Sequence, residues 1–179
     1  MGTRRIVTGY SSTGESVVIS DGLSPWIADA VHVRSLRSEL LWQTASPPRI
    51  PSTGVADPAI DATTFLPPPG YTTIQVVDFP PDASVTSTIA TPGDIGADFS
   101  KVFPGLAGRM ETQNPGMHFT DTIDYCVLLE GEIVLELDGG RTTVVRKHDV
   151  VIQNGTRHGW RNPSGQLARM LFVMIGGKR

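Results

Sequence analysis

The feature that most constrains the fold is a dense run of short apolar segments between residues 122 and 176, each ended by turn-forming residues. The turns are EG, GG, NGT and PSGQ, and the segments between them read IDYCVLL, EIVLELD, TTVVRK, DVVIQ, HGWRN and ARMLFVMI. Short apolar segments at such close, regular spacing predict antiparallel strands in an all-β sandwich or barrel with little helix.

The first 70 residues are less regular. RRIVTG and SVVISDG predict two short strands, and SELLWQT predicts either a strand or a helical turn. Residues 45–70 are rich in proline, which lacks an amide donor, so they predict an ordered loop or arm and not sheet interior. We therefore expect N-terminal strands and an extended arm over residues 1–70, without a core of their own. Residues 71–179 are expected to form the barrel domain.

Between the arm and the dense run, the sequence predicts one more strand and one helix. The segment YTTIQVVDFPP, which begins at Tyr71, has the alternating and β-branched character of a strand. The segment GDIGADFSKVFPGL is the best helical stretch of the chain, and Pro104 is expected to end it.

Composition narrows the class of protein. The chain has 179 residues, 39% hydrophobic and 18% charged, which suits one globular domain with a sizeable core. A net charge of -3 gives no electrostatic reason to bind nucleic acid or anionic lipid. No apolar run is long enough to cross a bilayer or to act as a secretory signal, and one cysteine, Cys126, excludes an intrachain disulfide. We expect a cytoplasmic protein without nucleic-acid or membrane partners.

Two of the four histidines stand in patterned surroundings. His32 and His148 have no evident partner in the sequence, so a structural or exposed role is expected for them. His118 begins HFTDTIDY, and His158 begins HGWRN. The two stretches are separated by one hairpin, which can bring both histidines to one end of a barrel.

These two stretches resemble the paired motifs of the cupin superfamily. The first motif has a glycine, a histidine, an acid and a second glycine at fixed spacing, here Gly116, His118, Asp124 and Gly131. The second motif has an aspartate, a glycine, a histidine and an asparagine, here Asp149, Gly155, His158 and Asn162. The resemblance covers about residues 71–175 and is closest to small stand-alone cupins with HxTDTIDY and HxWRN signatures.

The resemblance implies a fold and an assembly. The fold would be the cupin double-stranded β-helix, a jelly-roll barrel, with the N-terminal arm added to it. The family likeness also implies a small-molecule substrate and a homodimer, with the N-terminal strands crossing onto the sheet of the partner subunit.

The departures from the family pattern define the expected metal site. Thr120 stands where the family has a second histidine, and Asp124 stands where it usually has glutamate. Two histidines and one carboxylate remain, which is the ligand count of the Fe(II) facial triad and is also sufficient for catalytic zinc. We expect His118, Asp124 and His158 to bind one divalent metal ion, with Zn, Fe, Mn and Ni all open.

The spacing of His118 and Asp124 requires the chain to bend. In a straight strand, six residue steps would separate them by ~20 Å, whereas metal ligands lie ~2 Å from the ion. The residues TDT, from Thr120 to Thr122, are turn formers and are expected to provide the bend. Three alternatives stay open. Asp121 could supply the carboxylate, Asp124 could cap a turn or pair with Arg157 or Arg161, or the pocket could hold no metal.

The walls of the pocket follow from strand alternation. His158, Trp160 and Asn162 share one face, on which Trp160 is expected to line the pocket and Asn162 to fix a turn. In the last strand, Met170, Phe172 and Met174 form one row and Leu171, Val173 and Ile175 the other, and one of these rows is expected to face inward. Thr120, Trp160 and Phe172 are expected to contact the substrate. Asp124 and His158 are expected to act in catalysis.

The resemblance suggests three functions, in this order. The first is a metal-dependent enzyme performing non-redox acid–base or Lewis-acid chemistry on a small oxygenated metabolite, as a dehydratase, decarboxylase, cyclase or isomerase of secondary metabolism or aromatic breakdown. The second is a non-haem Fe(II) dioxygenase with the two-histidine, one-carboxylate site. The third is a non-catalytic cupin that binds a small molecule.

Overall fold

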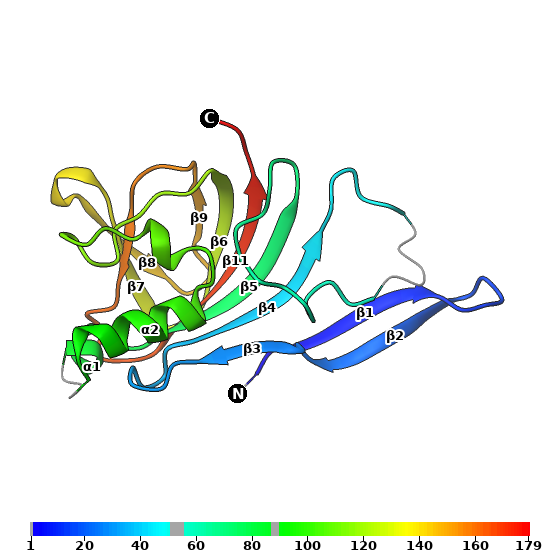
Figure 1. Ribbon diagram of the computed structural model, residues 1–179, viewed down its shortest axis with the longest axis horizontal. Coiled ribbons are helices and arrows are strands. Elements are labelled where there is room, and N and C mark those ends of the chain that lie inside the picture. Colours follow the sequence, from blue (N-terminus) through cyan, green and yellow to red (C-terminus); the bar gives the residue numbers. More distant parts are fainter. Residues whose placement is uncertain (1, 51–55, 87–89) are drawn as a thin grey trace.

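The computed structural model describes residues 2–50, 56–86 and 90–179, and it shows an all-β fold with two α-helices (Figure 1). The elements, in chain order, are β1 (Arg4–Tyr10), β2 (Ser16–Leu23), β3 (Trp26–Asp29), β4 (Arg37–Thr44), β5 (Thr72–Phe79), α1 (Asp82–Thr86), α2 (Pro92–Val102), the 3-10 turn η1 (Ala107–Arg109), β6 (Thr122–Glu130), β7 (Glu132–Glu136), the 3-10 turn η2 (Asp138–Gly140), β8 (Thr142–Arg146), β9 (Val150–Gln153), β10 (Gly159–Arg161) and β11 (Ala168–Gly176).

Two antiparallel sheets form the barrel. The larger sheet has the strand order β3-β4-β5-β11-β6-β9, and the smaller one has the order β10-β7-β8. Strands far apart in sequence are neighbours, because β11 lies between β5 and β6. The core draws side chains from both sheets, such as Leu40 and Met170 from the larger and Ile133 and Val145 from the smaller. The predicted all-β jelly roll is therefore confirmed.

Strict alternation along the central strands sets which side chains reach the interior. In β11, every second residue is buried, so Met170, Phe172 and Met174 form the inward row. In β6, Asp124 and Cys126 are buried while Ile123 and Tyr125 are about 44% exposed. A period of two along a strand places such residues on opposite faces. Tyr125 consequently lies outside the barrel.

Helix α2 confirms the predicted helical segment and packs beside β3. Thr91 caps it, accepting from the backbone N–H of Asp94, whose side chain accepts from the backbone N–H of Thr91 in return. The helix ends at Val102, two residues before Pro104. Among the described residues, no helix combines the length and the apolar character needed to cross a membrane.

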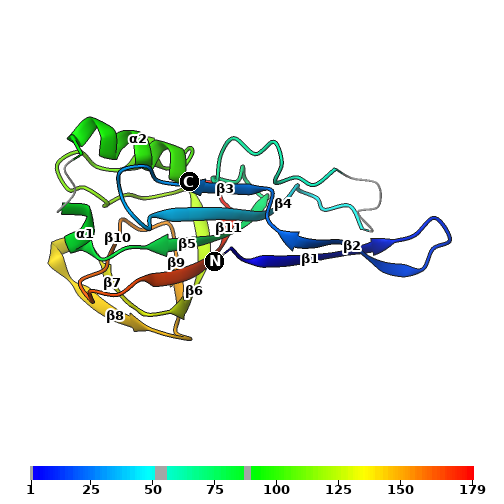
Figure 2. The same ribbon diagram turned by 90° about the horizontal axis from the view of Figure 1, so that it is seen from below.

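Strands β1 and β2 form a separate hairpin that projects from the barrel (Figures 1 and 2). Both strands were predicted, but the hairpin leaves large apolar side chains exposed, including Ile6 at 53% and Val18 at 56%. A two-stranded sheet is at best marginally stable by itself. The hairpin is therefore the surface that the predicted homodimer would cover. The dimer stays a prediction, as does the cytoplasmic location.

The segment SELLWQT, for which the sequence predicted either a strand or a helical turn, lies in strand β4. Together β3 and β4 extend the same sheet as β5, although both lie within the first 70 residues. The division of the chain at residue 70 stays a prediction. Part of the predicted proline-rich arm, residues 51–55, lies outside the described residues.

Gly176, the last residue of β11, is required by close packing against the proline turn. A Cβ at this position would overlap the backbone carbonyl group of Pro68. We expect Gly176→Ala to lower the free energy of unfolding by about 1–3 kcal/mol, because backbone atoms would have to move. Gly22→Ala in β2 is the matched control, since a Cβ there meets nothing within 4 Å. Urea denaturation of the two variants checks this, and equal stabilities would contradict it.

Candidate functional site

The two histidine motifs meet directly in space. His118 and His158 form an isolated antiparallel bridge in which each backbone N–H donates to the other residue's carbonyl oxygen at 2.9 Å. Their ring centroids lie 4.4 Å apart, with an angle of 53° between the ring planes. The sequence therefore identified the two histidines that the fold pairs.

Turns with left-handed glycines precede both histidines. Gly116 has φ 86° and lies within a turn that Met117 N–H closes by donating to Asn114 O at 3.0 Å. Gly155 has φ 59° and lies three residues before His158. Glycine adopts these values without the steric cost of a Cβ, so each motif glycine sets the direction from which its histidine enters the barrel.

Backbone carbonyls hold both imidazole rings. His118 Nδ1 lies 3.0 Å from Gly116 O, and His158 Nδ1 lies 2.9 Å from Thr156 O. A ring nitrogen bonded to a carbonyl oxygen must carry the proton, so in each neutral ring Nε2 keeps its lone pair. Burial lowers the pKa of His118, and burial followed by the neighbouring His118 lowers the pKa of His158 to about 4. Both rings are therefore neutral electron-pair donors at neutral pH.

Asp124 places an incompletely bonded carboxylate in the interior. It is 4% exposed on β6, between the cross-strand neighbours Met174 on β11 and Gln153 on β9. Its Oδ1 has no hydrogen-bond partner in the part of the chain that the structure describes. Burial raises the pKa of Asp124 to about 6, against a smaller opposing effect of the Thr122 hydroxyl. Buried polar atoms without partners are rare in folded proteins, and they often mark functional positions.

The structure bends at Asp121, the middle residue of the predicted TDT bend. The bend is shorter than predicted, because Thr122 already belongs to β6. Thr120 and Thr122 are both buried, and their Oγ1 atoms lie 2.7 Å apart. The inward alternation therefore continues from His118 through Thr120 and Thr122 to Asp124 without a reversal of the chain.

The predicted metal ligands can now be compared with their positions in the fold. Two neutral imidazoles and a carboxylate oxygen without a partner are suitable donors for a divalent ion. Among the described residues, however, no group of three or more His, Cys, Asp or Glu side chains is arranged to hold a metal. His118 and His158 face each other inside the barrel, where Asp124 is also buried. The shared site of His118, Asp124 and His158 stays a prediction.

Asp121, the alternative carboxylate, points away from the interior. It forms an ion pair with Arg179, and its Oδ2 lies 3.5 Å from Arg109 Nη1. With its side chain 40% exposed, Asp121 is a surface residue at the bend.

Neither suggested arginine pairs with Asp124. Arg157 binds Glu111, with Nε–Oε1 at 2.5 Å, and Arg161 binds Glu136, with Nε–Oε2 at 2.6 Å. The alternative in which Asp124 pairs with Arg157 or Arg161 is therefore wrong, and no described Lys, Arg or His side chain forms an ion pair with Asp124.

Aromatic side chains line the interior next to the histidines. The ring centroids of His158 and Trp160 are 5.9 Å apart, and those of Trp160 and Phe172 are 6.1 Å apart, both in edge-to-face geometry. Trp160 comes from the smaller sheet and Phe172 from the larger, so the two rings connect the sheets across the interior. Contacts of Thr120, Trp160 and Phe172 with a substrate stay predictions.

Gln75 is a candidate that the sequence analysis missed. It is 4% exposed on β5, and its Nε2 donates to Met174 Sδ at 3.2 Å. Its Oε1 has no partner among the described residues. Phe172 lies beside it in the strand register. The sequence does contain a sign of this role, because Gln75 is a polar residue within the largely apolar strand segment TTIQVVDF.

The remaining predicted roles have clear outcomes. Asn162 fixes a turn, because its Nδ2 donates to Phe79 O and Gln166 O. Cys126 is buried, and burial raises its pKa, which suits an inert thiol. His32 does have a partner, since its Nδ1 lies 3.5 Å from the Asp98 carboxylate.

A jelly-roll barrel of two antiparallel sheets, with paired histidines from its two motifs facing each other inside, defines a cupin-like protein. No protein-family model matches the chain. The chain is 36% identical over 115 residues to phomopsin biosynthesis cluster protein C' of Diaporthe leptostromiformis, covering 60% of this chain and 58% of that protein. It is 45% identical over 65 residues to oryzines biosynthesis cluster protein J of Aspergillus oryzae, covering 36% of each chain.

A third relative carries the name of the family. The cupin-domain-containing oxidoreductase virC of Hypocrea virens is 35% identical over 112 residues, which cover 52% of this chain and 58% of that protein. The matches therefore span from about a third to somewhat over half the length of these relatives. They confirm the resemblance to the cupin superfamily. The narrower likeness to small stand-alone cupins stays a prediction.

Solved cupin structures are more distant. The cupin domain of Schizosaccharomyces pombe Cnp3 has a TM-score of 0.47 at 14% identity, covering 98% of this chain and 89% of that one. A cupin 2 conserved barrel domain protein from Salinispora arenicola has a TM-score of 0.41 at 16% identity, covering 82% and 81%. The fold assignment rests on the strand topology described above and on the sequence relatives.

Proposed function

We propose that this protein is a cupin-type enzyme that performs non-redox acid–base chemistry on a small oxygenated metabolite. The observation that carries the proposal is the buried Asp124 oxygen without a hydrogen-bond partner, in a barrel that also holds two neutral imidazoles. A carboxylate kept unsatisfied inside a barrel costs stability, so a role in binding or moving a proton of a ligand gives it a reason to be there.

In this proposal each inward group has a defined task. Asp124 accepts or returns a proton, and His158, with its Nδ1 held by Thr156 O, presents Nε2 to the ligand as a second proton acceptor. The hydroxyl of Thr120 can bond an oxygen of the ligand, while Trp160 and Phe172 exclude water. Dehydration, decarboxylation, cyclisation and isomerisation all require such proton movement. The names of the oryzines and phomopsin cluster proteins support a setting in secondary metabolism.

A second candidate is a redox enzyme of the Fe(II) dioxygenase type. The relative virC is named an oxidoreductase, and the two-histidine, one-carboxylate donor set has the composition that such iron sites use. The geometry favours this candidate less, because the three donors are not gathered into one centre.

Metal content and oxygen uptake distinguish the candidates. We expect protein purified without chelators to convert candidate hydroxy and keto acids without consuming oxygen. We expect His158→Ala to lower kcat/KM at least 100-fold, since positioned acid–base groups contribute about 10²–10⁴-fold. His32→Ala is the control, because His32 pairs with Asp98 at a different place in the fold.

Other outcomes would overturn the proposal in recognisable ways. Bound iron with oxygen uptake that His118→Ala abolishes would establish the dioxygenase in its place. Ligand binding that survives His158→Ala, together with no turnover in the wild type, would establish a non-catalytic binder.

A further inference from the structure

A cavity of about 280 Å³ lies at one end of the barrel, apart from the histidine pair. Its walls include the three consecutive prolines Pro67–Pro69, the side chains of Arg109 and Asp121, and Thr122 at the start of β6. The sequence analysis assigned no role to the prolines beyond a loop, and it did not consider Arg109.

Backbone hydrogen bonds hold the walls of this cavity. Gly70 N–H donates to Gly176 O at 2.8 Å, and Tyr71 N–H donates to Pro68 O at 2.9 Å. On the opposite side, Gly177 N–H donates to Asp121 O at 2.7 Å. The proline turn, the end of β11 and the bend at Asp121 are therefore joined. A cavity with fixed walls avoids much of the ordering cost of binding a ligand.

One guanidinium and one carboxylate, those of Arg109 and Asp121, line the cavity. Asp121 is the carboxylate shared by two guanidinium groups: Arg179 forms the close pair, whereas Arg109 Nη1 lies 3.5 Å from Asp121 Oδ2. Arg179 also donates to Gly155 O at 2.7 Å, so its position is fixed. The Arg109 side chain makes no hydrogen bond to the described residues. Its donors are thus available to a ligand in the cavity.

The chemistry of the walls selects the kind of ligand. Prolines have no N–H groups and present ring carbons, so most of the wall can contact an apolar body. One guanidinium with free donors matches one carboxylate, which it can bind through two parallel hydrogen bonds. The Asp121 carboxylate beside Arg109 would repel a doubly charged phosphate more strongly than a singly charged carboxylate. The walls therefore fit an organic monocarboxylate.

Thr122 connects this cavity to the interior. Thr122 lines the cavity, and its Oγ1 lies 2.7 Å from Thr120 Oγ1. Asp124 is the next inward residue of the same strand. A carboxylate ligand held at Arg109 would consequently lie beside the start of β6, two residues before Asp124.

We propose that this cavity binds the carboxylate of a small organic acid through Arg109, with Pro67–Pro69 contacting its apolar part. That this acid is also the substrate rests on the proposed function. The existence of the carboxylate site is independent of that function.

Benzoate and benzamide are suitable probes, because they share a flat apolar ring and differ in charge. By NMR titration at low salt, we expect benzoate to bind the wild type at least tenfold more tightly than benzamide, and Arg109→Gln to remove this difference. Arg141→Gln is the matched control, since Arg141 is exposed and lies after η2, away from the cavity. Asp121→Asn should tighten benzoate binding several-fold, because it neutralises the carboxylate that competes for Arg109.

The result that overturns this proposal is benzamide binding as tightly as benzoate, or equal losses in Arg109→Gln and Arg141→Gln. Thermal melting of each variant verifies that it is folded. If Asp121→Asn is unfolded, the comparison of the two arginine variants still decides the question. Benzoate binding requires no turnover, and we expect it to survive in His158→Ala. A failure of the acid–base proposal can therefore be distinguished from a failure of the carboxylate site.

Discussion

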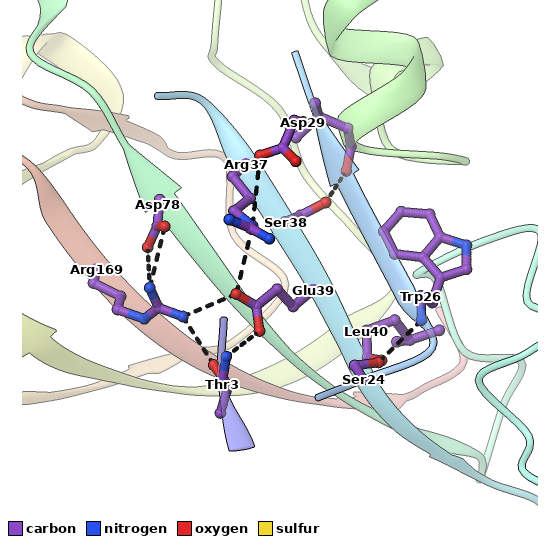
Figure 3. A network of polar contacts seen from close by, with 11 residues as sticks. Thr3, Ser24, Trp26, Asp29, Arg37, Ser38, Glu39, Leu40, Asp78 and Arg169 are labelled. Carbon is purple, nitrogen blue, oxygen red and sulfur yellow. Dashed lines mark hydrogen bonds and ion pairs between the residues drawn. The ribbon is translucent and has the colours of Figure 1, made fainter. Parts of the chain in front are cut away.

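Replacing Glu39 with glutamine is expected to lower the free energy of unfolding by about 3 kcal/mol, as is typical when one partner of a buried ion pair is neutralised. Glu39 is 1% exposed on β4, and both of its carboxylate oxygens are bonded. Oε2 accepts from the backbone N–H of Thr3 at 2.7 Å, and Oε1 accepts from Arg169 Nη2 at 3.0 Å. Figure 3 shows these contacts joining the N-terminal segment to β4 and β11.

The size of this effect follows from the charges that would remain. Arg169 would lose one carboxylate partner and keep Asp78, at 3.2 Å. Arg37, whose Nε lies 3.6 Å from Glu39 Oε1, would lose the more buried of the two acidic neighbours that the described residues give it. Positive charge would then be left incompletely balanced in a poorly hydrated place. Because folded domains are stable by only about 5–15 kcal/mol, this single change would remove a large share of the total.

Urea denaturation at pH 7 measures the effect, and an exposed ion pair provides the control. Arg4 and Asp21 pair across β1 and β2 with side chains 67% and 43% exposed, so Asp21→Asn should leave the free energy of unfolding nearly unchanged. If Glu39→Gln costs no more than Asp21→Asn, the network of Figure 3 does not hold the N-terminal segment as we infer.

The parts of the fold that could be predicted are those that local pattern determines. Period-two alternation divided the last strand into the row of Phe172 and the row of Leu171, because burial on one face constrains every second residue. The structure shows that the row of Phe172 is the inward one. The cupin motifs then identified His118 and His158 as neighbours, since each motif glycine permits the turn that its histidine requires.

The parts that could not be predicted depend on partners distant in sequence. Glu39 and Arg169 are 130 positions apart, and Asp121 and Arg179 are 58 apart, so no local pattern connects them. The extent of the TDT bend also depended on a distant partner. The chain bends at Asp121, but Thr122 pairs with Gly176 in the register between β6 and β11, and this sheet pairing overrides the turn preference of threonine.

Asp124→Asn is expected to make the protein more stable at pH 7, the opposite direction from most substitutions at buried positions. Burial raises the pKa of Asp124 from 3.8 to about 6 in the folded chain. The folded state therefore holds this proton more tightly than the unfolded state does. The stability that the protonated carboxyl contributes is present below about pH 4 and is lost as the pH rises through 6.

The expected gain for Asp124→Asn is about 2–3 kcal/mol above pH 7 and close to zero near pH 4, because asparagine cannot ionise. Urea denaturation across this pH range, in protein treated with EDTA so that no cation contributes, measures the difference. A difference that does not change with pH would show that the ionised Asp124 carries no burial cost. A carboxylate that destabilises its own fold at neutral pH needs another reason for being at that position, and the ligand chemistry proposed for the barrel interior supplies one.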